Sequence, residues 1–363
     1  MADNSCCCLH EGITGDRKET LMKTLNGYMH GVNLGGWLSQ CDHTTERYDT
    51  FIREEDIENI SRRGLDHIRV PVDYDLVEDA EGNYLEEGFA YIQKAIDWCG
   101  KYGLNMVLDL HKTFGFSFDD GEEESGFFDN EEYQERFYRL WEQFAARYGK
   151  YGDRIAFELL NEVTEKEYSD SWNRISTECI KRIRKIAPDN KILLGGYYNN
   201  SIEALEDLAM PYDDNVVYNF HCYEPLIFTH QGAYWVHGMD TSFRMRIDST
   251  YGEYSQHARK QLDHFFTDLD RFGKDRKFGA EFFEDLISEA VRVAKERNTA
   301  LYCGEFGVID LAEPEDTVEW YRMICSVFDK YGIGRAAWSY REMDFGLSDE
   351  RMKEAAETII RLI

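Results

Sequence analysis

The 363-residue sequence has few basic residues for its size: 41 Lys and Arg stand against 70 Asp and Glu, a formal net charge of −29. No stretch rich in Lys or Arg offsets this excess locally, so the chain would repel nucleic-acid phosphates and anionic lipids. An apolar run long enough to span a bilayer is also missing. We therefore expect no nucleic acid and no membrane as partners.

The first twenty residues lack both the basic start and the apolar segment of a secretory leader. The nine cysteines, an odd number, are scattered without the paired spacing of a metal site. We expect a cytoplasmic protein with reduced thiols and without a metal or other cofactor. We also expect residues 1–21 to be a disordered tail, residues 22–363 to form one domain, and the protein to be a monomer.

Short apolar runs alternate with longer amphipathic segments from residue 30 to the end, which is the pattern of βα units around a parallel sheet. No G-x-G-x-x-G follows the first run, which argues against a nucleotide-binding sheet. The count and the alternation predict an α/β fold, a (β/α)₈ TIM barrel. The predicted strands are residues 30–36, 66–73, 105–111, 155–163, 191–197, 216–223, 301–309 and 334–340.

The stretch from residue 225 to 280, after the sixth predicted strand, is far longer than an ordinary βα connection and is rich in aromatic residues. We expect a partly helical subdomain here that acts as a lid. Its aromatic side chains should mostly fill the core of that subdomain, because a small unit needs large side chains to bury enough area.

Polar side chains gather at the predicted strand ends, where TIM barrels place their active sites. Glu162 and Glu305 stand out, since each follows an apolar run, and strands four and seven lie across a barrel from each other. Cleavage of a glycosidic bond needs two such carboxyl groups on opposite sides of a sugar. Either glutamate alone could instead form a structural salt bridge. For the pair together, this interpretation is less favoured. The other residues of this set are Arg69, His111, Asn161, His221, Tyr223 and Trp338.

Two histidines and two tryptophans have more than one interpretation. His111 and His221 could ligate a metal, but neither belongs to an H-x-H or H-E-x-x-H pattern, so hydrogen bonding to a sugar is the better role. Trp338 and Trp37 could belong to the core, but an indole at the end of a strand can stack on a pyranose ring. We therefore include both tryptophans among the predicted sugar-binding residues.

The motifs resemble, in order and spacing, those of glycoside hydrolase family 5, from about Tyr28 to the C-terminus. They are R-V-P, L-D-L-H, N-E, H-C-Y, G-E-F-G and a tryptophan that closes the eighth strand. The resemblance implies a retaining β-glycoside hydrolase that needs no metal. Its partner would be a soluble β-1,4 or mixed β-1,3/1,4 glucan or oligosaccharide.

The resemblance also implies roles for single residues. Glu162 would be the acid/base, Glu305 the nucleophile, and Asn161 a ligand of the sugar 2-hydroxyl. Arg69 and Tyr223 would hold the nucleophile ionised and oriented. The residues lining the subsite of the glycosyl-enzyme would be His111, His221 and Trp338.

One position departs from the family: Lys112 follows His111 where a second histidine is common. Sugar preference therefore stays open at this point, and an exo-acting β-glucosidase, β-1,3-glucosidase or β-mannosidase of the same family fits the motifs as well. A catalytically silent carbohydrate-binding barrel and a metal-dependent hydrolase are the remaining alternatives.

Overall fold

Eight parallel strands close into a barrel in sequence order, with β1 paired to both β2 and β8. The computed structural model describes residues 22–119, 125–262 and 269–363, so the predicted tail lies outside the described residues. The predicted (β/α)₈ fold is confirmed. The strands are β1 (His30–Asn33), β2 (His67–Asp73), β3 (Asn105–Lys112), β4 (Ile155–Glu158), β5 (Ile192–Leu194), β6 (Val216–His221), β7 (Leu301–Phe306) and β8 (Gly334–Ala337).

Most strands end before the predicted position, and β4 shows why. It ends at Glu158, although the apolar run continues through Leu159 and Leu160. Both leucines are buried but lie outside the ladder of β4. Burial continues past the ladder, so an apolar run alone does not reveal where the strand ends.

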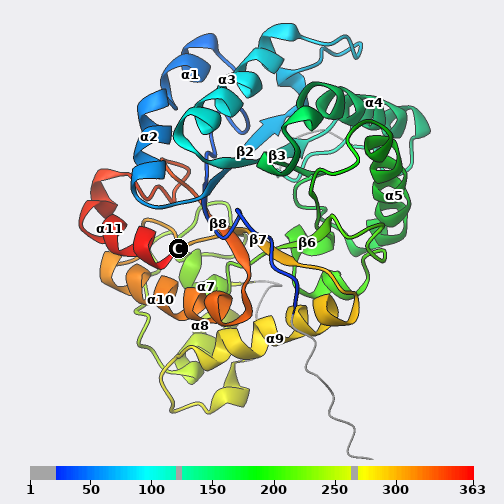
Figure 1. Ribbon diagram of the computed structural model, residues 1–363. Helices are drawn as coiled ribbons and strands as arrows, with labels where there is room; N and C mark the ends of the chain where they lie inside the picture. The colour runs from blue at the N-terminus through cyan, green and yellow to red at the C-terminus, as the bar shows by residue number, and fades with distance from the viewer. Residues whose placement is uncertain (1–21, 120–124, 263–268) are drawn as a thin grey trace, which may run out of the picture.

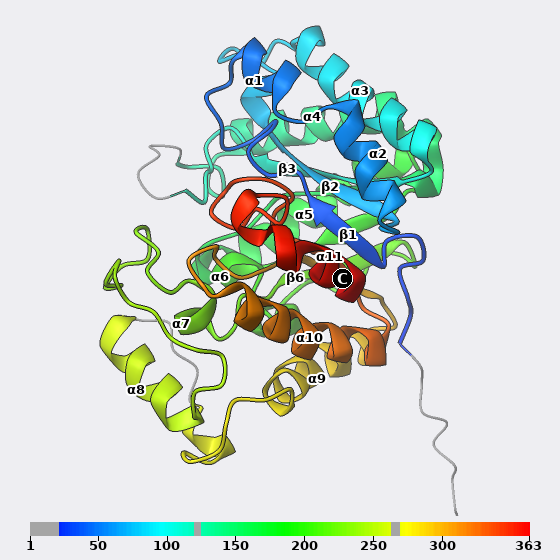
Figure 2. The same ribbon diagram turned by 90° about the vertical axis from the view of Figure 1, so that its left-hand side faces the viewer.

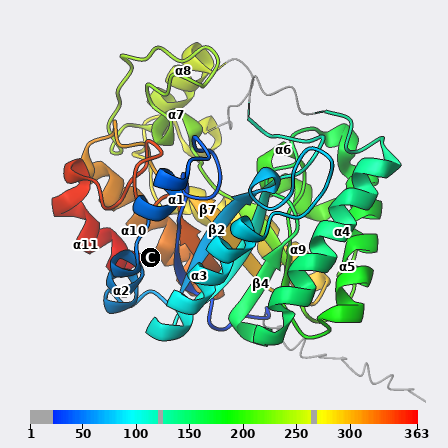
Figure 3. The ribbon, with the colours of Figure 1, turned by 90° about the horizontal axis from the view of Figure 1, so that it is seen from above.

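Helices surround the barrel, as Figures 1 and 3 show. Two of them end at glycines in the left-handed conformation that a helix C-terminus favours, Gly103 (φ 72°) and Gly332 (φ 68°). No described helix is long and apolar enough to cross a membrane. The helices are α1 (Thr45–Thr50), α2 (Glu54–Arg62), α3 (Glu86–Tyr102), α4 (Glu131–Tyr148), α5 (Ser169–Ile186), α6 (Tyr197–Asn200), α7 (Leu226–Thr229), α8 (Tyr251–Gln261), α9 (Glu281–Glu296), α10 (Pro314–Tyr331) and α11 (Lys353–Leu362).

The inside of the barrel changes from apolar to charged along the strands. Alternate residues of a strand face the same side, so Ala156 and Glu158 of β4 both face inward, as do Val107 and Asp109 of β3. Ala156 and Val107 belong to an apolar cluster that fills the N-terminal half. Glu158 and Asp109 are equally buried one layer higher. The C-terminal half of the interior is thus a buried polar layer on which the site is built.

Residues 225–280, which separate β6 from the barrel helix α9, contain α7, α8 and a short 3₁₀ turn (Asp270–Phe272). Figure 2 shows α8 set away from the barrel, with α7 closer to it. The ring of Phe278 packs on those of Tyr251 and Tyr254, with centroids 5.6 and 4.8 Å apart. These aromatics are core residues, as expected, but they belong to the same hydrophobic core as the barrel and not to a separate one. Tyr234 and Trp235 differ, with 77% and 39% of their surface exposed.

Candidate active site

Arg69 anchors the polar layer. The sequence placed it at a strand end, but it lies inside β2 and is fully buried. Its Nε and Nη2 donate to the two carboxylate oxygens of Glu158 at 2.7 and 2.8 Å, and Asn219 donates to the same carboxylate at 2.7 Å. Burial raises the pKa of Glu158 and Arg69 opposes this rise. Three N–H donors directed at two oxygens hold Glu158 as a carboxylate.

The upper side of the same guanidinium holds two predicted site residues. Nη1 donates to Oε1 of Glu305 at 2.7 Å, and Nη2 donates to Oδ1 of Asn161 at 2.8 Å. Burial opposes the charge of Arg69, but Asp109, Glu158 and Glu305 together raise its pKa well above the usual value. The cation is therefore permanent, and it fixes the positions of both residues.

Glu305 lies near the end of β7 with both oxygens engaged. Oε1 meets Arg69, and Oε2 accepts a hydrogen bond from the Tyr223 hydroxyl at 2.9 Å. Burial raises the pKa of Tyr223, with Glu305 adding to the effect, so the phenol stays a donor. A Cβ at Gly304 would lie 2.7 Å from Asn219, which explains the glycine before the glutamate. The arrangement suits a carboxylate that stays charged.

Glu162 lies four residues beyond the end of β4, at φ 42°, a backbone conformation uncommon for glutamate. Its Oε1 is 2.7 Å from Nδ1 of His221, and its Oε2 accepts from Nδ2 of Asn199 at 3.0 Å. Burial raises the pKa of Glu162, the direction required of a group that must carry a proton near neutral pH.

The two glutamates face each other across His221. Ligand atoms of Glu162, His221 and Glu305 lie within 4.8 Å of one another. Carboxyl groups about 5–5.5 Å apart are typical of retaining glycosidases, and a separation of about 6.5–9.5 Å is typical of inverting ones. Burial lowers the pKa of His221 to about 4, so its ring is neutral and adds no charge between the two carboxyl groups. This geometry can support double displacement.

The structure also brings Asn161, His111 and Trp338 to the site. Nδ2 of Asn161 is buried and has no partner within the described part of the chain, so it is a donor available to a hydroxyl of a bound sugar. Nδ1 of His111 lies 2.6 Å from Asp109, and its ring is nearly parallel to that of Trp338, 5.9 Å away. Burial opposes protonation of His111, but Asp109 raises its pKa.

Trp37 does not join this set, so its prediction as a sugar-binding residue is corrected. Its side chain is fully buried, its indole N–H donates to the carbonyl of Tyr48 at 2.9 Å, and its ring stacks on Trp98 of α3. It is part of the main hydrophobic core, where it packs against α3. The sequence position, a few residues past β1, is equally compatible with a place in the core and with a place in the sugar site.

A left-handed turn after β5 contributes two residues that the sequence did not predict. Tyr198 (φ 50°, ψ 52°), Asn199 (φ 57°, ψ 53°) and Asn200 (φ 57°) are consecutive residues with positive φ. This conformation costs about 1–2 kcal/mol per residue, less for asparagine. Asn199 reaches Glu162, and Nδ2 of Asn200 lies 3.3 Å from Nε2 of His221. Adjacent asparagines after a strand were the available signal, since asparagine tolerates this conformation best.

Asp109 and Glu158 were also missed, although both break an apolar run in the middle of a predicted strand. Gln40 is a third, with Oε1 lying 3.3 Å from Nε2 of His111 and Nε2 donating to Asp119 at 3.0 Å. Lys112, the departure from the family, pairs with the same Asp119 at 2.7 Å. This polar edge lies beside His111.

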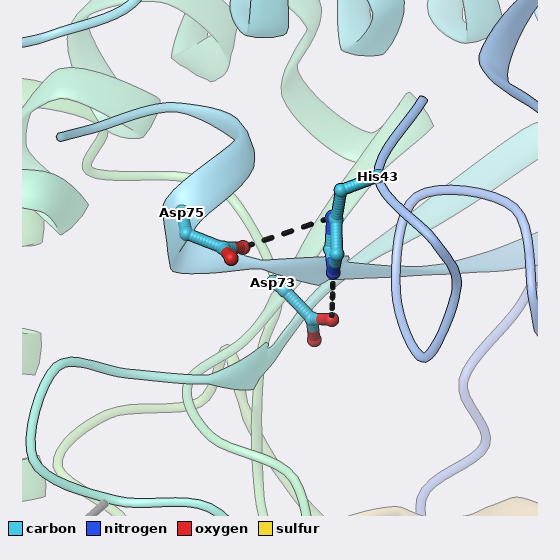
Figure 4. Close-up of side chains that lie close together, drawn as sticks. All are labelled: His43, Asp73 and Asp75. Carbon is cyan, nitrogen blue, oxygen red and sulfur yellow. Dashed lines mark ion pairs between the residues drawn. The ribbon is translucent and has the colours of Figure 1, made fainter. Parts of the chain in front are cut away.

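Two groups in the described residues have spacing that could suit a metal ion. In the catalytic group, Arg69 already neutralises Glu305, and a cation beside another cation is unfavourable. Figure 4 shows the other, in which Nε2 of His43 faces Asp73 at 3.5 Å and Nδ1 faces Asp75 at 3.9 Å. Each ring nitrogen of His43 thus faces a different carboxylate. The hydrogen bond with Asp73 raises the pKa of His43, as in a structural ion pair.

Comparisons with known proteins find relatives over most of the chain. The sequence model of the cellulase family, glycosyl hydrolase family 5, matches residues 29–344. Cellodextrinase A of Ruminococcus flavefaciens is 49% identical over 309 residues, covering 85% of this chain and 84% of the relative. Endoglucanase C of Acetivibrio thermocellus is 37% identical over 338 residues, covering 92% and 97%.

Solved structures give the same result. The crystal structure of endoglucanase Cel5A from Thermotoga maritima superposes with a TM-score of 0.72 at 26% identity, covering 93% of this chain and 97% of that one. The same enzyme has been solved with cellobiose, at a TM-score of 0.71 and 25% identity over 93% of this chain and all of that one.

Proposed function

The chain belongs to glycosyl hydrolase family 5 and is a retaining β-glucan-cleaving glycoside hydrolase, and on this basis we propose which residues act and on what. Glu305 is the nucleophile and Glu162 the acid/base. The observation that carries the assignment is the contrast between two carboxyl groups that have oxygens within 4.8 Å of each other. Glu305 is paired with a permanent cation, and Glu162 has neutral hydrogen-bond partners.

In the first step a carboxylate oxygen of Glu305 forms a bond to the anomeric carbon while the bond to the leaving oxygen breaks. The proton of Glu162 moves to that oxygen. In the second step water attacks the same carbon, Glu162 takes its proton, and Glu305 leaves as a carboxylate. The anomeric configuration is retained. Asn161, fixed by Arg69, donates its free N–H to the sugar during both steps.

The substrates we propose are short soluble β-1,4 or mixed-linkage oligosaccharides and glucans. The similarity to a cellodextrinase supports short substrates, and the similarity to endoglucanase C supports glucans. The polar edge of Gln40, Lys112 and Asp119 beside His111 offers donors and acceptors for sugar hydroxyls. We expect higher kcat/KM on soluble mixed-linkage glucan and cello-oligosaccharides than on crystalline cellulose.

Residues 225–280 supply a lid in this proposal. Ala233 packs in one cluster with Ile309, Trp338 and Phe345, so the start of the insertion touches the closing tryptophan of the site. Trp235 lies next to this cluster, with its ring 6.4 Å from that of Phe345, and is partly exposed at the surface. Exposed aromatic rings next to a sugar site can stack on pyranose rings remote from the cleaved bond.

A single experiment tests the function. Glucan, mannan and xylan oligosaccharides are incubated with the protein, products are sized, and the anomer formed first is identified by proton NMR, with Glu305→Gln as the inactive control. We expect cleavage of β-glucans with a β-anomer as the first product. An α-anomer as the first product would contradict the proposal, and so would turnover of no β-glucan, including cleavage confined to mannan or xylan.

A further inference from the structure

We propose that Asn199 is a positioning residue for Glu162: its side-chain amide holds the carboxyl group through Oε2 and favours the ionised form, which sets the upper pH limit of activity. This inference rests on the proposed role of Glu162 as acid/base. It concerns a residue of the turn after β5 that touches no reacting atom of the substrate in the proposed mechanism.

The hydrogen bonds around the turn fix Asn199 relative to Glu162. Its backbone N–H donates to the carbonyl of Val163 at 3.1 Å, and the N–H of Tyr198 donates to the carbonyl of Thr164 at 3.1 Å. The turn is therefore joined to the segment that directly follows Glu162. The side-chain bond of 3.0 Å to Oε2 closes a ring between the two segments.

Burial of their own side chains does not explain the backbone conformation of Tyr198 and Asn199. The side chain of Asn199 is exposed, and so is that of Tyr198, which adopts the same left-handed conformation although its side chain is bulky. Neither residue has a buried side chain that would offset the backbone strain. Strain that persists at such a place is found at functional sites, where the surrounding structure maintains it.

An amide N–H can donate but cannot accept, so Asn199 stabilises the carboxylate more than the protonated acid. It therefore acts against burial, which raises the pKa of Glu162. The other groups that face Glu162 come from four strands and from two segments that follow strands. They are Arg69 of β2, His111 of β3, Asp119 after β3, His221 of β6, Tyr223 after β6 and Glu305 of β7.

Two substitutions test the inference, and both suit a positive φ. Asn199→Gly removes the amide without adding backbone strain, and Asn199→Asp replaces the donor with a negative charge. We expect the alkaline limb of kcat/KM on an unactivated oligosaccharide to move up by about half to one pH unit in N199G, the equivalent of one hydrogen bond to a charged group at a partly exposed site. N199D should move it further, because a neighbouring negative charge opposes ionisation.

The matched control is Asn298→Gly, which makes the same replacement at another exposed asparagine with positive φ (52°), before β7. It should leave the pH profile unchanged. Unshifted limbs in both Asn199 variants, or a shift to lower pH, would overturn the inference. Glu162→Gln is measured alongside. If it keeps full activity on the oligosaccharide, the proposed function fails. If it loses activity but the pH profiles of the Asn199 variants do not shift, only the present inference fails.

Discussion

Replacing Arg69 with lysine should weaken both the fold and the chemistry, because lysine cannot reach the same partners. The guanidinium donates two hydrogen bonds to Glu158 and one to Glu305, all of 2.7–2.8 Å. An ammonium group lacks the planar fork that makes the paired contact. Breaking a buried ion pair costs about 3–5 kcal/mol, and domains are stable by only about 5–15 kcal/mol. R69K should therefore fold with a large part of its stability lost.

Two measurements check this expectation. Urea unfolding followed by tryptophan fluorescence should show a lower midpoint, and kcat/KM should fall about 100-fold, since misplacing a reacting group by about 1 Å has that effect. Arg335→Lys is the control, because Arg335 is equally buried but lies near the start of β8 and pairs with the exposed Asp329. It should cost less stability and leave kcat/KM unchanged. Equal results for R69K and R335K would refute the reasoning.

Three further predictions follow from the site. Glu305→Gln should still fold yet lose kcat by several orders of magnitude, and azide should rescue Glu305→Gly with an inverted product. Normal turnover by Glu305→Gln would show that Glu305 is not the nucleophile. Burial raises the pKa of Glu162, and its protonated form is needed, so kcat/KM should fall as the pH rises through that pKa. On an activated aryl glycoside, Glu162→Gln should lack this fall at high pH. If the fall stays unchanged in the variant, another group causes it. Trp235→Ala should lower kcat/KM on long oligosaccharides far more than on that aryl glycoside; equal losses would contradict the lid.

The barrel could be predicted from the sequence because strands buried on both faces give continuous apolar runs, separated by amphipathic helices. The glutamates could be predicted as well, since Glu162 and Glu305 each interrupt or follow such a run where a free carboxylate is costly. Both signals are local. They depend on the neighbours along the chain, which the sequence shows directly.

Trp37 and Asn199 could not be placed in this way, because their positions depend on contacts between distant segments. Trp37 is buried by Trp98 of α3, sixty-odd residues away in the chain, and nothing near residue 37 indicates this. Asn199 reaches Glu162 only because the turn after β5 adopts a left-handed conformation, which residues other than glycine seldom adopt. Asp109 and Glu158, by contrast, were within reach: a two-residue period read through β3 and β4 puts both inside the barrel.

The different supports of the two glutamates follow from what each must do during the reaction. Glu305 has to remain a carboxylate until it attacks, and it lies within the ladder of β7 against a permanent cation that belongs to the same rigid barrel. Glu162 has to give up a proton and later take one, so a strong charge of either sign beside it would hinder one of the two steps. Its partners are a neutral histidine, with its pKa lowered to about 4 by burial, and an amide.

A lysine in place of Asn199 should therefore slow the protonation step, because an ammonium group at Oε2 would favour the carboxylate more strongly than the amide does. N199K should lose activity on oligosaccharides but keep the first step on an activated aryl glycoside, whose leaving group needs little protonation. If N199K keeps the parent activity on both substrates, Glu162 tolerates a fixed charge beside it, and the argument from neutral partners is wrong.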